Sequence, residues 1–224
     1  APDADDIEDV AGNDLAPTGW SYAVAIPPTV TNRVPAPGAT ISSSATNVDV
    51  TFSEPVQGVD ADDLVLTGAA ALGAVVDAPT NIGGNTWRFP LSGLVNGALN
   101  VSLAPDANDV EDLAGNDLAN VTWSYTVDLT PPTITNRAPT PGSTIVGWTV
   151  NLDVTFSEAV HGVDVTDLVL SGPAAVAASV GAPTHPGGNT WRFPVTGLRS
   201  GVLIVTLAPD PDDIQDPAGH DLAA

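Results

Sequence analysis

Residues 47–54 read Asn-Val-Asp-Val-Thr-Phe-Ser-Glu, and residues 151–158 read Asn-Leu-Asp-Val-Thr-Phe-Ser-Glu. In the first of these segments the apolar side chains of Val48, Val50 and Phe52 alternate with polar ones. A period of two places alternate side chains on opposite faces of an extended chain, so the pattern predicts a β-strand with one buried face. The chain therefore uses the same half-buried strand twice.

The duplication extends over most of the chain. Residues 26–120 aligned with residues 130–224 give 58 identities in 95 positions. A second block, Asn-Thr-Trp-Arg-Phe-Pro, occurs at residues 85–90 and again at residues 189–194, with the same offset of 104. Solenoid units are much shorter than this, so each copy is expected to fold as a domain with its own core. The sequence predicts a tandem array of similar domains.

The phase of the repeat predicts the domain boundaries. Residues 1–24 match residues 104–127, which are the last part of a unit. The sequence stops just before the second unit reaches its own Trp-Ser-Tyr segment. We therefore expect the end of a preceding repeat, one complete repeat, and one repeat without its last strand, at residues 1–25, 26–128 and 129–224.

Two interpretations explain this phase. In the simpler one, the sequence is a window from a longer array of similar units. In the other, residues 19–24 fill the place of the last strand in a neighbouring molecule by strand addition. The window is favoured because residues 1–16 duplicate residues 208–223, an overlap that a donor strand does not need.

Proline and glycine, 21 of each, are too frequent for long helices and suit turns and strand ends. Short segments rich in β-branched residues lie between these turn signals, which is typical of an all-β sandwich. Pro35, Pro37 and Gly38 predict the first hairpin corner, and the Pro-Pro pairs at residues 27–28 and 131–132 predict short, semi-rigid joints. In the complete repeat we expect strands near residues 29–34, 39–42, 47–54, 63–67, 72–77, 86–91, 97–103 and 121–127.

Composition excludes several kinds of site and partner. There is no cysteine, so neither disulfides nor thiolate metal sites form. With 27 acidic residues and five arginines the net charge is -22, which repels nucleic acid and anionic membrane surfaces. No apolar run approaches the roughly 18 residues of a membrane helix. Cations are the natural partners, although so much charge also keeps a long surface protein soluble in a salty medium.

The order of three short motifs resembles the bacterial Ig-like domains found in tandem in S-layer and giant cell-surface proteins. They are Pro-x-Pro-Gly-x-Thr-Ile, Val-Thr-Phe-Ser-Glu and Asp-x-Ala-Gly-Asn-Asp-Leu, at residues 35–41, 50–54 and 112–118, with copies at residues 139–145, 154–158 and 216–222. The last copy departs from the pattern at Pro217 and His220. The resemblance implies tandem Ig-like β-sandwiches that act outside the cell as spacer or adhesive modules without catalysis.

One acidic cluster occurs three times, each within seven residues. Carboxylates so close together repel one another unless a counter-ion is present, and Ca²⁺ accepts 6–8 hard oxygen ligands with forgiving geometry. The spacing is not that of an EF-hand. The alternative is that Asp and Asn stand in these turns because their side chains bond nearby backbone N–H groups. The candidate calcium ligands here are Asp3, Asp5, Asp6, Asp9, Asp106, Asn108, Asp109, Asp112, Asp210, Asp212, Asp213 and Asp216.

Ig-like topology brings further acids to the same pole of each domain, the pole that faces the preceding unit. Asp128 in the joint between the repeats faces the pole of the second repeat, whereas the first joint, residues 25–28, has no acid. We therefore expect a calcium ion at the second boundary and not at the first. The acids expected to approach the clusters are Glu54, Asp60, Asp63, Glu158, Asp164 and Asp167.

The remaining candidates carry weaker signals. Trp87 and Trp191 fit core packing, with stacking on a sugar ring as the alternative. Arg88 and Arg192 are expected to pair with carboxylates. The three histidines have no copy in the other repeat and no partner histidine, so they indicate neither a zinc site nor a catalytic base.

The sequence therefore predicts a non-catalytic extracellular spacer or stalk that is stiffened by Ca²⁺ and whose partners are neighbouring repeats of the same chain. Near-identical copies favour this role, because a spacer gains length by duplicating a unit that already folds. The alternatives are an adhesive or carbohydrate-binding module that contacts surface glycans, and a subunit of a surface lattice or filament that packs laterally with like subunits or exchanges strands.

Overall fold

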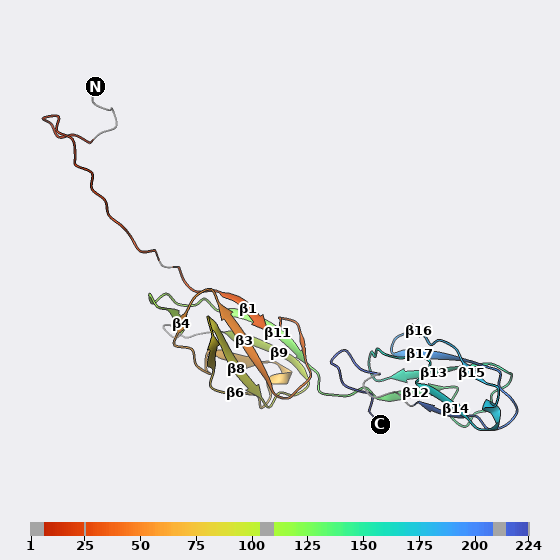
Figure 1. Cartoon of the computed structure of the whole chain (residues 1–224). Coiled ribbons are helices and arrows are strands. Elements are labelled where there is room, and N and C mark those ends of the chain that lie inside the picture. Colours follow the sequence, from red (N-terminus) through yellow and green to blue (C-terminus); the bar gives the residue numbers. More distant parts are fainter. Residues whose placement is uncertain (1–6, 25, 104–109, 208–213, 224) are drawn as a thin grey trace.

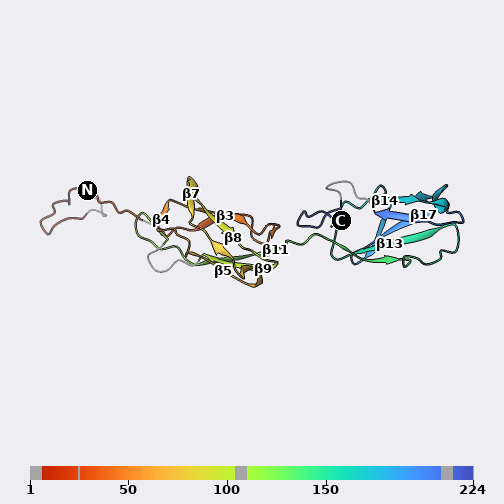
Figure 2. The same cartoon turned by 90° about the horizontal axis from the view of Figure 1, so that it is seen from below.

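The computed structural model describes residues 7–24, 26–103, 110–207 and 214–223. Two β-sandwiches follow one another, and residues 7–24 extend away from the first (Figures 1 and 2). Within the described ranges no helix is long and apolar enough to cross a membrane.

The first sandwich has two main sheets. One contains β1 (Val30–Val34), β3 (Thr46–Phe52), β8 (Thr86–Ser92) and β6 (Val75–Val76) in that order, with β7 (Thr80–Gly83) also paired to β8. The other contains β2 (Thr40–Ile41), β11 (Val121–Val127), β9 (Gly97–Leu103) and β5 (Leu64–Thr67). A short pair joins β4 (Val56–Gln57) to β10 (Glu111–Asp112), and a 3₁₀ turn, η1 (Ala69–Ala71), follows β5.

The core of this sandwich lies between the two sheets. Val48, Val50 and Phe52 of β3 are buried, as the alternation predicts. The opposite sheet supplies buried side chains from β9 and β11, including Trp123 and Tyr125. The sandwich is therefore closed by apolar side chains from both faces, which confirms the all-β fold.

The second sandwich repeats the first sheet in the same register. It contains β12 (Ile134–Ala138), β13 (Val150–Phe156), β17 (Thr190–Thr196) and β15 (Ser179–Val180), with β16 (Thr184–Gly187) paired to β17. The opposite sheet contains only β14 (Leu168–Ser171) and β18 (Ile204–Leu207) among the described residues, and η2 (Pro173–Ala175) follows β14. β18 corresponds to β9, and the place that β11 takes in the first sandwich has no strand from the described part of this repeat.

One prediction about the strands is wrong. Pro35, Pro37 and Gly38 do not form a hairpin corner, because β1 pairs with β3 whereas β2 pairs in parallel with β11 in the opposite sheet. Proline has no N–H to donate to a strand ladder, so β1 ends at this corner. The chain then crosses to the opposite sheet, where β2 pairs with β11. The eight predicted strands of the complete repeat are all present, with small differences in their ends.

Candidate functional site

The joint between the repeats is bonded to the first sandwich. Directly after β11, the N–H of Asp128 donates to the carbonyl oxygen of Ile41 at 3.0 Å. The next N–H, that of Leu129, donates to Oδ1 of Asn96 at 2.6 Å. The carboxylate of Asp128 accepts hydrogen bonds from the hydroxyl and N–H of Thr130, at 3.0 and 3.2 Å. These bonds fix Asp128 at the end of the first sandwich.

The last loop of the second repeat folds back on the joint. Asp216 is fully buried, and its Oδ1 accepts the N–H of His220 at 2.9 Å. Leu222 N–H donates to the carbonyl of Ile214 at 2.9 Å, which closes the loop. Ala223 N–H donates to the carbonyl of Pro132 at 2.9 Å, which ties the loop to the joint.

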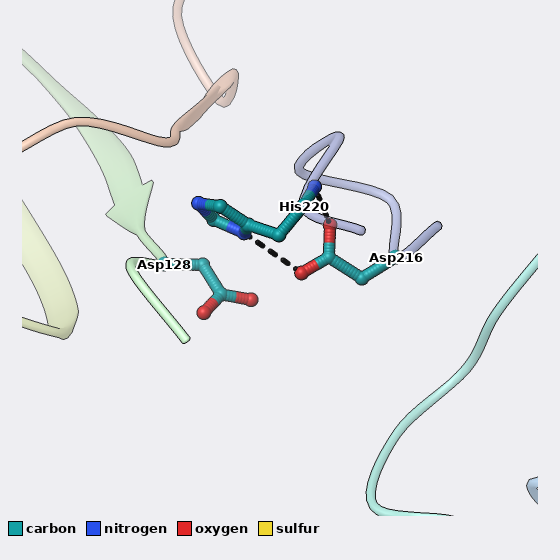
Figure 3. Close-up of side chains that lie close together, drawn as sticks. All are labelled: Asp128, Asp216 and His220. Carbon is teal, nitrogen blue, oxygen red and sulfur yellow. Dashed lines mark hydrogen bonds and ion pairs between the residues drawn. The ribbon is translucent and has the colours of Figure 1, made fainter. Parts of the chain in front are cut away.

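Three side chains meet where the two repeats meet, and we call Asp128, Asp216 and His220 the seam cluster. One ligand atom from each lies within 4.8 Å of the others (Figure 3). Nδ1 of His220 lies 2.9 Å from Oδ2 of Asp216, and its Nε2 lies 3.2 Å from the carbonyl oxygen of Ser42 in the first sandwich. The cluster thus draws on both repeats and on the joint.

The hydrogen bonds of His220 specify its charge. A carboxylate and a carbonyl oxygen can only accept, so both ring nitrogens must donate, which requires the imidazolium form. The hydrogen bond to Asp216 raises the pKa of His220, with a smaller contribution from the charge of Asp128. Burial raises the pKa of Asp216, but hydrogen bonds from the N–H and ring of His220 outweigh it and leave that pKa lowered.

Glu158 shows that the seam has an excess of negative charge. Burial raises its pKa, and repulsion by Asp128 and then by Asp216 raises it further. A carboxyl group repelled in this way gains when a cation approaches. The proton on His220 supplies one positive charge for three carboxylates, so the seam favours additional cations.

Residues 24–127 match the model of the bacterial Ig-like domain family. These residues are a bacterial Ig-like domain. The second Ig-like repeat is its near copy, with 58 identities over 95 aligned positions. No curated protein matches the chain.

Several solved structures are similar to the Ig-like chain. FdeC, an adhesin of Escherichia coli, matches at 17% identity and a TM-score of 0.42, over 82% of this chain and 60% of its own. Invasin, a bacterial integrin-binding protein, matches at 17% identity and a TM-score of 0.39, over 80% of this chain and 36% of its own. The D00–D0 domain of intimin matches at 13% identity and a TM-score of 0.37, over 82% of this chain and 100% of its own. The chain spans less than two thirds of the FdeC and invasin chains.

The structure brings two of the predicted calcium ligands, Asp128 and Asp216, together with His220 at the second Ig-like boundary. A third, Glu158, lies near enough for the charges of Asp128 and Asp216 to raise its pKa. No other group of this kind occurs among the described residues. Glu54 is half-buried after β3 in the first repeat. The predicted ligands that lie outside the described residues are Asp3, Asp5, Asp6, Asp106, Asn108, Asp109, Asp210, Asp212 and Asp213.

Other predicted ligands are engaged by their own turns. Oδ1 of Asp112 accepts the N–H groups of Ala114 and Asn116 at 2.7 and 2.9 Å, and Oδ2 accepts Nδ2 of Asn116 at 2.8 Å. Asp9 makes the same three bonds, with Ala11 and Asn13. These hydrogen bonds lower the pKa of both carboxyls, with those from the asparagines first. This is the geometry expected of turn residues whose side chains bond nearby backbone N–H groups.

A second pair of turns repeats between the two Ig-like units. Oδ2 of Asp63 accepts the N–H of Asp60 at 2.7 Å, and Oδ2 of Asp167 accepts the N–H of Asp164 at the same distance. Asp164 in turn accepts the N–H and hydroxyl of Thr166, which lower its pKa. These four acids organise the loop before β5 and its copy before β14.

His220 is the member of the seam cluster that the sequence does not indicate as a ligand. Like the other two histidines, it has no copy in the other repeat. The available signal was its position: it stands four residues after Asp216, where Asn116 follows Asp112, in the loop predicted to face Asp128. The titratable His220 thus occurs in the copy of this loop next to the joint that contains Asp128.

The predicted arginine pairs are confirmed. Nε and Nη2 of Arg88 donate to the two carboxylate oxygens of Asp49, both at 2.7 Å. Arg192 and Asp153 repeat the pair at 2.7 and 2.8 Å. Each bidentate pair joins neighbouring strands, β3 to β8 or β13 to β17.

The two predicted core tryptophans are half-buried. Trp87 and Trp191 pack against the first and second cores. The ring of Trp191 also contacts the ring of His185, with centroids 5.2 Å apart. Both tryptophans therefore contribute to packing, and stacking on a sugar ring stays a prediction.

Proposed function

We propose that the chain is a structural spacer of a bacterial surface protein, with tandem Ig-like repeats that set distance outside the cell and perform no catalysis. The observation that carries this proposal is a joint bonded to both repeats. Asp128 N–H bonds to Ile41 of the first sandwich, and Ala223 of the second sandwich bonds back to Pro132. A spacer needs such a joint, because free swivelling between domains would shorten its mean reach.

The duplication supports the same role. Each sandwich has a hydrophobic core made from its own residues, so length can grow by adding units without redesigning an interface. The absence of cysteine and the net charge of -22 suit a protein that stays soluble in an oxidising, salty medium. Neighbouring repeats of the same chain are then its first partners.

We further propose that Ca²⁺ stiffens the joint by binding at the seam cluster together with Glu158. Asp128, Glu158 and Asp216 supply hard carboxylate oxygens, and backbone carbonyls such as that of Ser42 lie at the same seam. The raised pKa of Glu158 supports this proposal, because burial and unbalanced negative charge both disfavour its ionised form. Protonated His220 competes with the ion for the same carboxylates.

Small-angle scattering tests both parts of the proposal. The 224-residue chain is measured with Ca²⁺ and with a chelator at about pH 8, because a higher pH favours the neutral form of His220, which competes less for the carboxylates. We expect an extended molecule in both conditions and a narrower distribution of interdomain distances with Ca²⁺. Asp128→Ala is expected to abolish the difference, whereas Asp77→Ala, which removes an exposed carboxylate outside the seam, is expected to keep it.

The two parts fail separately. Identical scattering with and without Ca²⁺ contradicts the stiffening by Ca²⁺ but not the spacer role. A broad range of interdomain angles in every condition removes the spacer itself. Calcium-linked melting gives a second readout, because a ligand at a hundred times its Kd stabilises the folded state by about 2.7 kcal/mol.

A further inference from the structure

The seam cluster contains one donor that Ca²⁺ does not need, the imidazole of His220. One ligand atom from each of Asp128, Asp216 and His220 lies within 4.8 Å of the others. Figure 3 shows both carboxylates on the side of the ring that carries Nδ1. Imidazole and carboxylate together are a ligand set for zinc and similar ions, whereas Ca²⁺ takes oxygen ligands. The cluster therefore fits a second class of cation.

The orientation of the His220 ring leaves Nδ1 as the ligand atom. Nε2 lies 3.2 Å from the carbonyl oxygen of Ser42, which can only accept, so Nε2 keeps its proton. Nδ1 lies 2.9 Å from Oδ2 of Asp216, and a positive group must stand between these two atoms, either a proton or a metal ion. A metal-bound histidine usually donates its other N–H to a backbone carbonyl or a carboxylate, which fixes the ring. Ser42 provides such a carbonyl.

The two carboxylates are held with an oxygen available to an ion. Asp216 is fully buried, and its Oδ1 accepts the N–H of His220, which keeps Oδ2 directed at the ring. Both bonds from Thr130 go to Oδ1 of Asp128, and within the described part of the chain none goes to its Oδ2. Zinc bonds of 2.0–2.2 Å place two tetrahedral ligands roughly 3.4 Å apart. A small rotation of the half-buried Asp128 side chain is enough to close the cluster on an ion.

Charge favours the ion over the proton. Two carboxylates and one imidazolium leave one negative charge uncompensated, and a divalent ion in place of the proton on Nδ1 makes the cluster neutral. Glu158, which Asp128 and Asp216 repel, adds further negative charge beside it. Three protein ligands leave the fourth position of a tetrahedral ion to water or to Glu158.

We propose that the seam cluster binds a divalent ion of the zinc class through Nδ1 of His220 and the carboxylates of Asp128 and Asp216. The ion displaces the proton from Nδ1 and fastens the last loop of the second repeat to the joint. The sequence indicates no zinc site because His220 has no partner histidine, but the joint and the loop supply carboxylates instead. The proposal uses the seam of the proposed spacer and does not require Ca²⁺.

The first repeat provides a matched variant that removes only the nitrogen ligand. Its corresponding loop closes in the same way, with Leu118 N–H bonded to the carbonyl of Val110 at 2.8 Å, as Leu222 bonds to Ile214. Asn116 takes the place of His220 there and bonds to its own aspartate. His220→Asn is therefore expected to keep the loop folded and to lose the zinc ligand.

Nitrogen NMR of the imidazole rings tests the ligand atom directly, because the chain has only three histidines. The 224-residue chain is titrated with Zn²⁺. We expect Nδ1 of His220 to shift while its Nε2 keeps a proton, and the rings of His161 and His185 to stay unchanged. Binding without a change at His220, or binding through Nε2, overturns the proposal.

Titration calorimetry with Zn²⁺ measures the affinity. His220→Asn is expected to raise the Kd at least about tenfold, since even the loss of a group that only orients a ligand costs 10–100-fold. His185→Asn, at an exposed position of β16, is the control and is expected to keep the affinity. Equal affinity in the unchanged chain and in His220→Asn contradicts the proposal.

The same variant separates this proposal from the stiffening by Ca²⁺. Imidazole is not a ligand that Ca²⁺ prefers, so His220→Asn is expected to keep the scattering response to Ca²⁺ and to lose the binding of Zn²⁺. Scattering that is identical with and without Ca²⁺, together with a Zn²⁺ shift at Nδ1 of His220, contradicts the stiffening by Ca²⁺ and supports the zinc site.

Discussion

His220 and Asn116 stand at equivalent positions of the two repeats and bond to equivalent carboxylates, Asp216 and Asp112. Asn116 donates Nδ2 to Asp112 at 2.8 Å, whereas His220 donates Nδ1 to Asp216 at 2.9 Å and reaches Ser42 of the other sandwich with Nε2. One substitution therefore turns a neutral turn bond into a charged contact between domains. It also makes that contact sensitive to pH.

We predict that the second repeat is more stable near pH 5.5 than near pH 8. The pKa of His220 is raised in the folded state, so its stabilising contribution is complete below the unfolded value of about 6.5 and is lost as the pH rises through the folded value. His220→Asn, which restores the residue of the first repeat, is expected to reduce this dependence. Thermal unfolding at both pH values measures it.

Glu158 provides the control for this prediction. Its pKa is also raised, so it too destabilises the folded state as the pH rises, starting near its unfolded value of about 4.5. Glu158→Gln is expected to leave the loss between pH 6 and pH 8 in place. If His220→Asn retains the full loss and Glu158→Gln removes it, the assignment to His220 is wrong.

Charge counting could predict that Arg88 pairs with a carboxylate, because acids far outnumber arginines, but it could not name Asp49 as the partner. It could not predict the contact of His220 with Ser42, because these residues are 178 positions apart and belong to different domains. That contact depends on how one sandwich sits on the other. No local pattern encodes this arrangement.

Among the elements, the long alternating strands are the ones that the sequence shows most clearly. β3 and β8 are seven residues long and alternate, so their buried faces are visible in the sequence. The four-residue β7 is not predicted. Neither are β4 and β10, which have two residues each and therefore show no period. Their pairing depends on a contact between loops, in which Nε2 of Gln57 donates to Oε1 of Glu111 at 2.8 Å.

Turn glycines give an element-level prediction. Gly93, between β8 and β9, has a φ of +71°, and a Cβ there would lie 2.6 Å from the carbonyl oxygen of Gly73. Gly38 has a φ of +84° with open space around it. Gly38→Ala is expected to cost about 1 kcal/mol from its backbone conformation alone, and Gly93→Ala about 3 kcal/mol because the neighbouring strand connection must also shift.

Denaturant unfolding of the first repeat measures both glycine variants. Gly38→Ala controls for the positive φ, so the difference between the two variants isolates the steric contact. Equal losses would show that the carbonyl of Gly73 moves freely and that the close approach has no structural role.

For the molecule as a whole, the duplication predicted two similar sandwiches and a short joint, because 58 identities in 95 positions leave little room for a different fold. It did not predict that, of the proposed ligands among the described residues, Asp128 and Asp216 would meet at the seam with Glu158 nearby. Asp9 and Asp112 are bonded within their own turns, which follows from local backbone geometry that the acidic spacing does not distinguish from metal binding.

The same comparison predicts that the two repeats unfold separately, with the second at the lower temperature. Eighteen described residues form the buried core of the first sandwich and eight form that of the second, where no strand among the described residues takes the place of β11. Less apolar burial means less stabilisation. Calorimetry is therefore expected to show two transitions.

Matched core variants assign these transitions. Phe89 and Phe193 are fully buried at equivalent positions of β8 and β17. Each Phe→Ala change is expected to cost about 3 to 5 kcal/mol in its own repeat. Phe89→Ala should lower only the upper transition and Phe193→Ala only the lower one. If both variants move one common transition, the joint couples the sandwiches into a single folding unit, and length could not grow by simple addition of independent repeats.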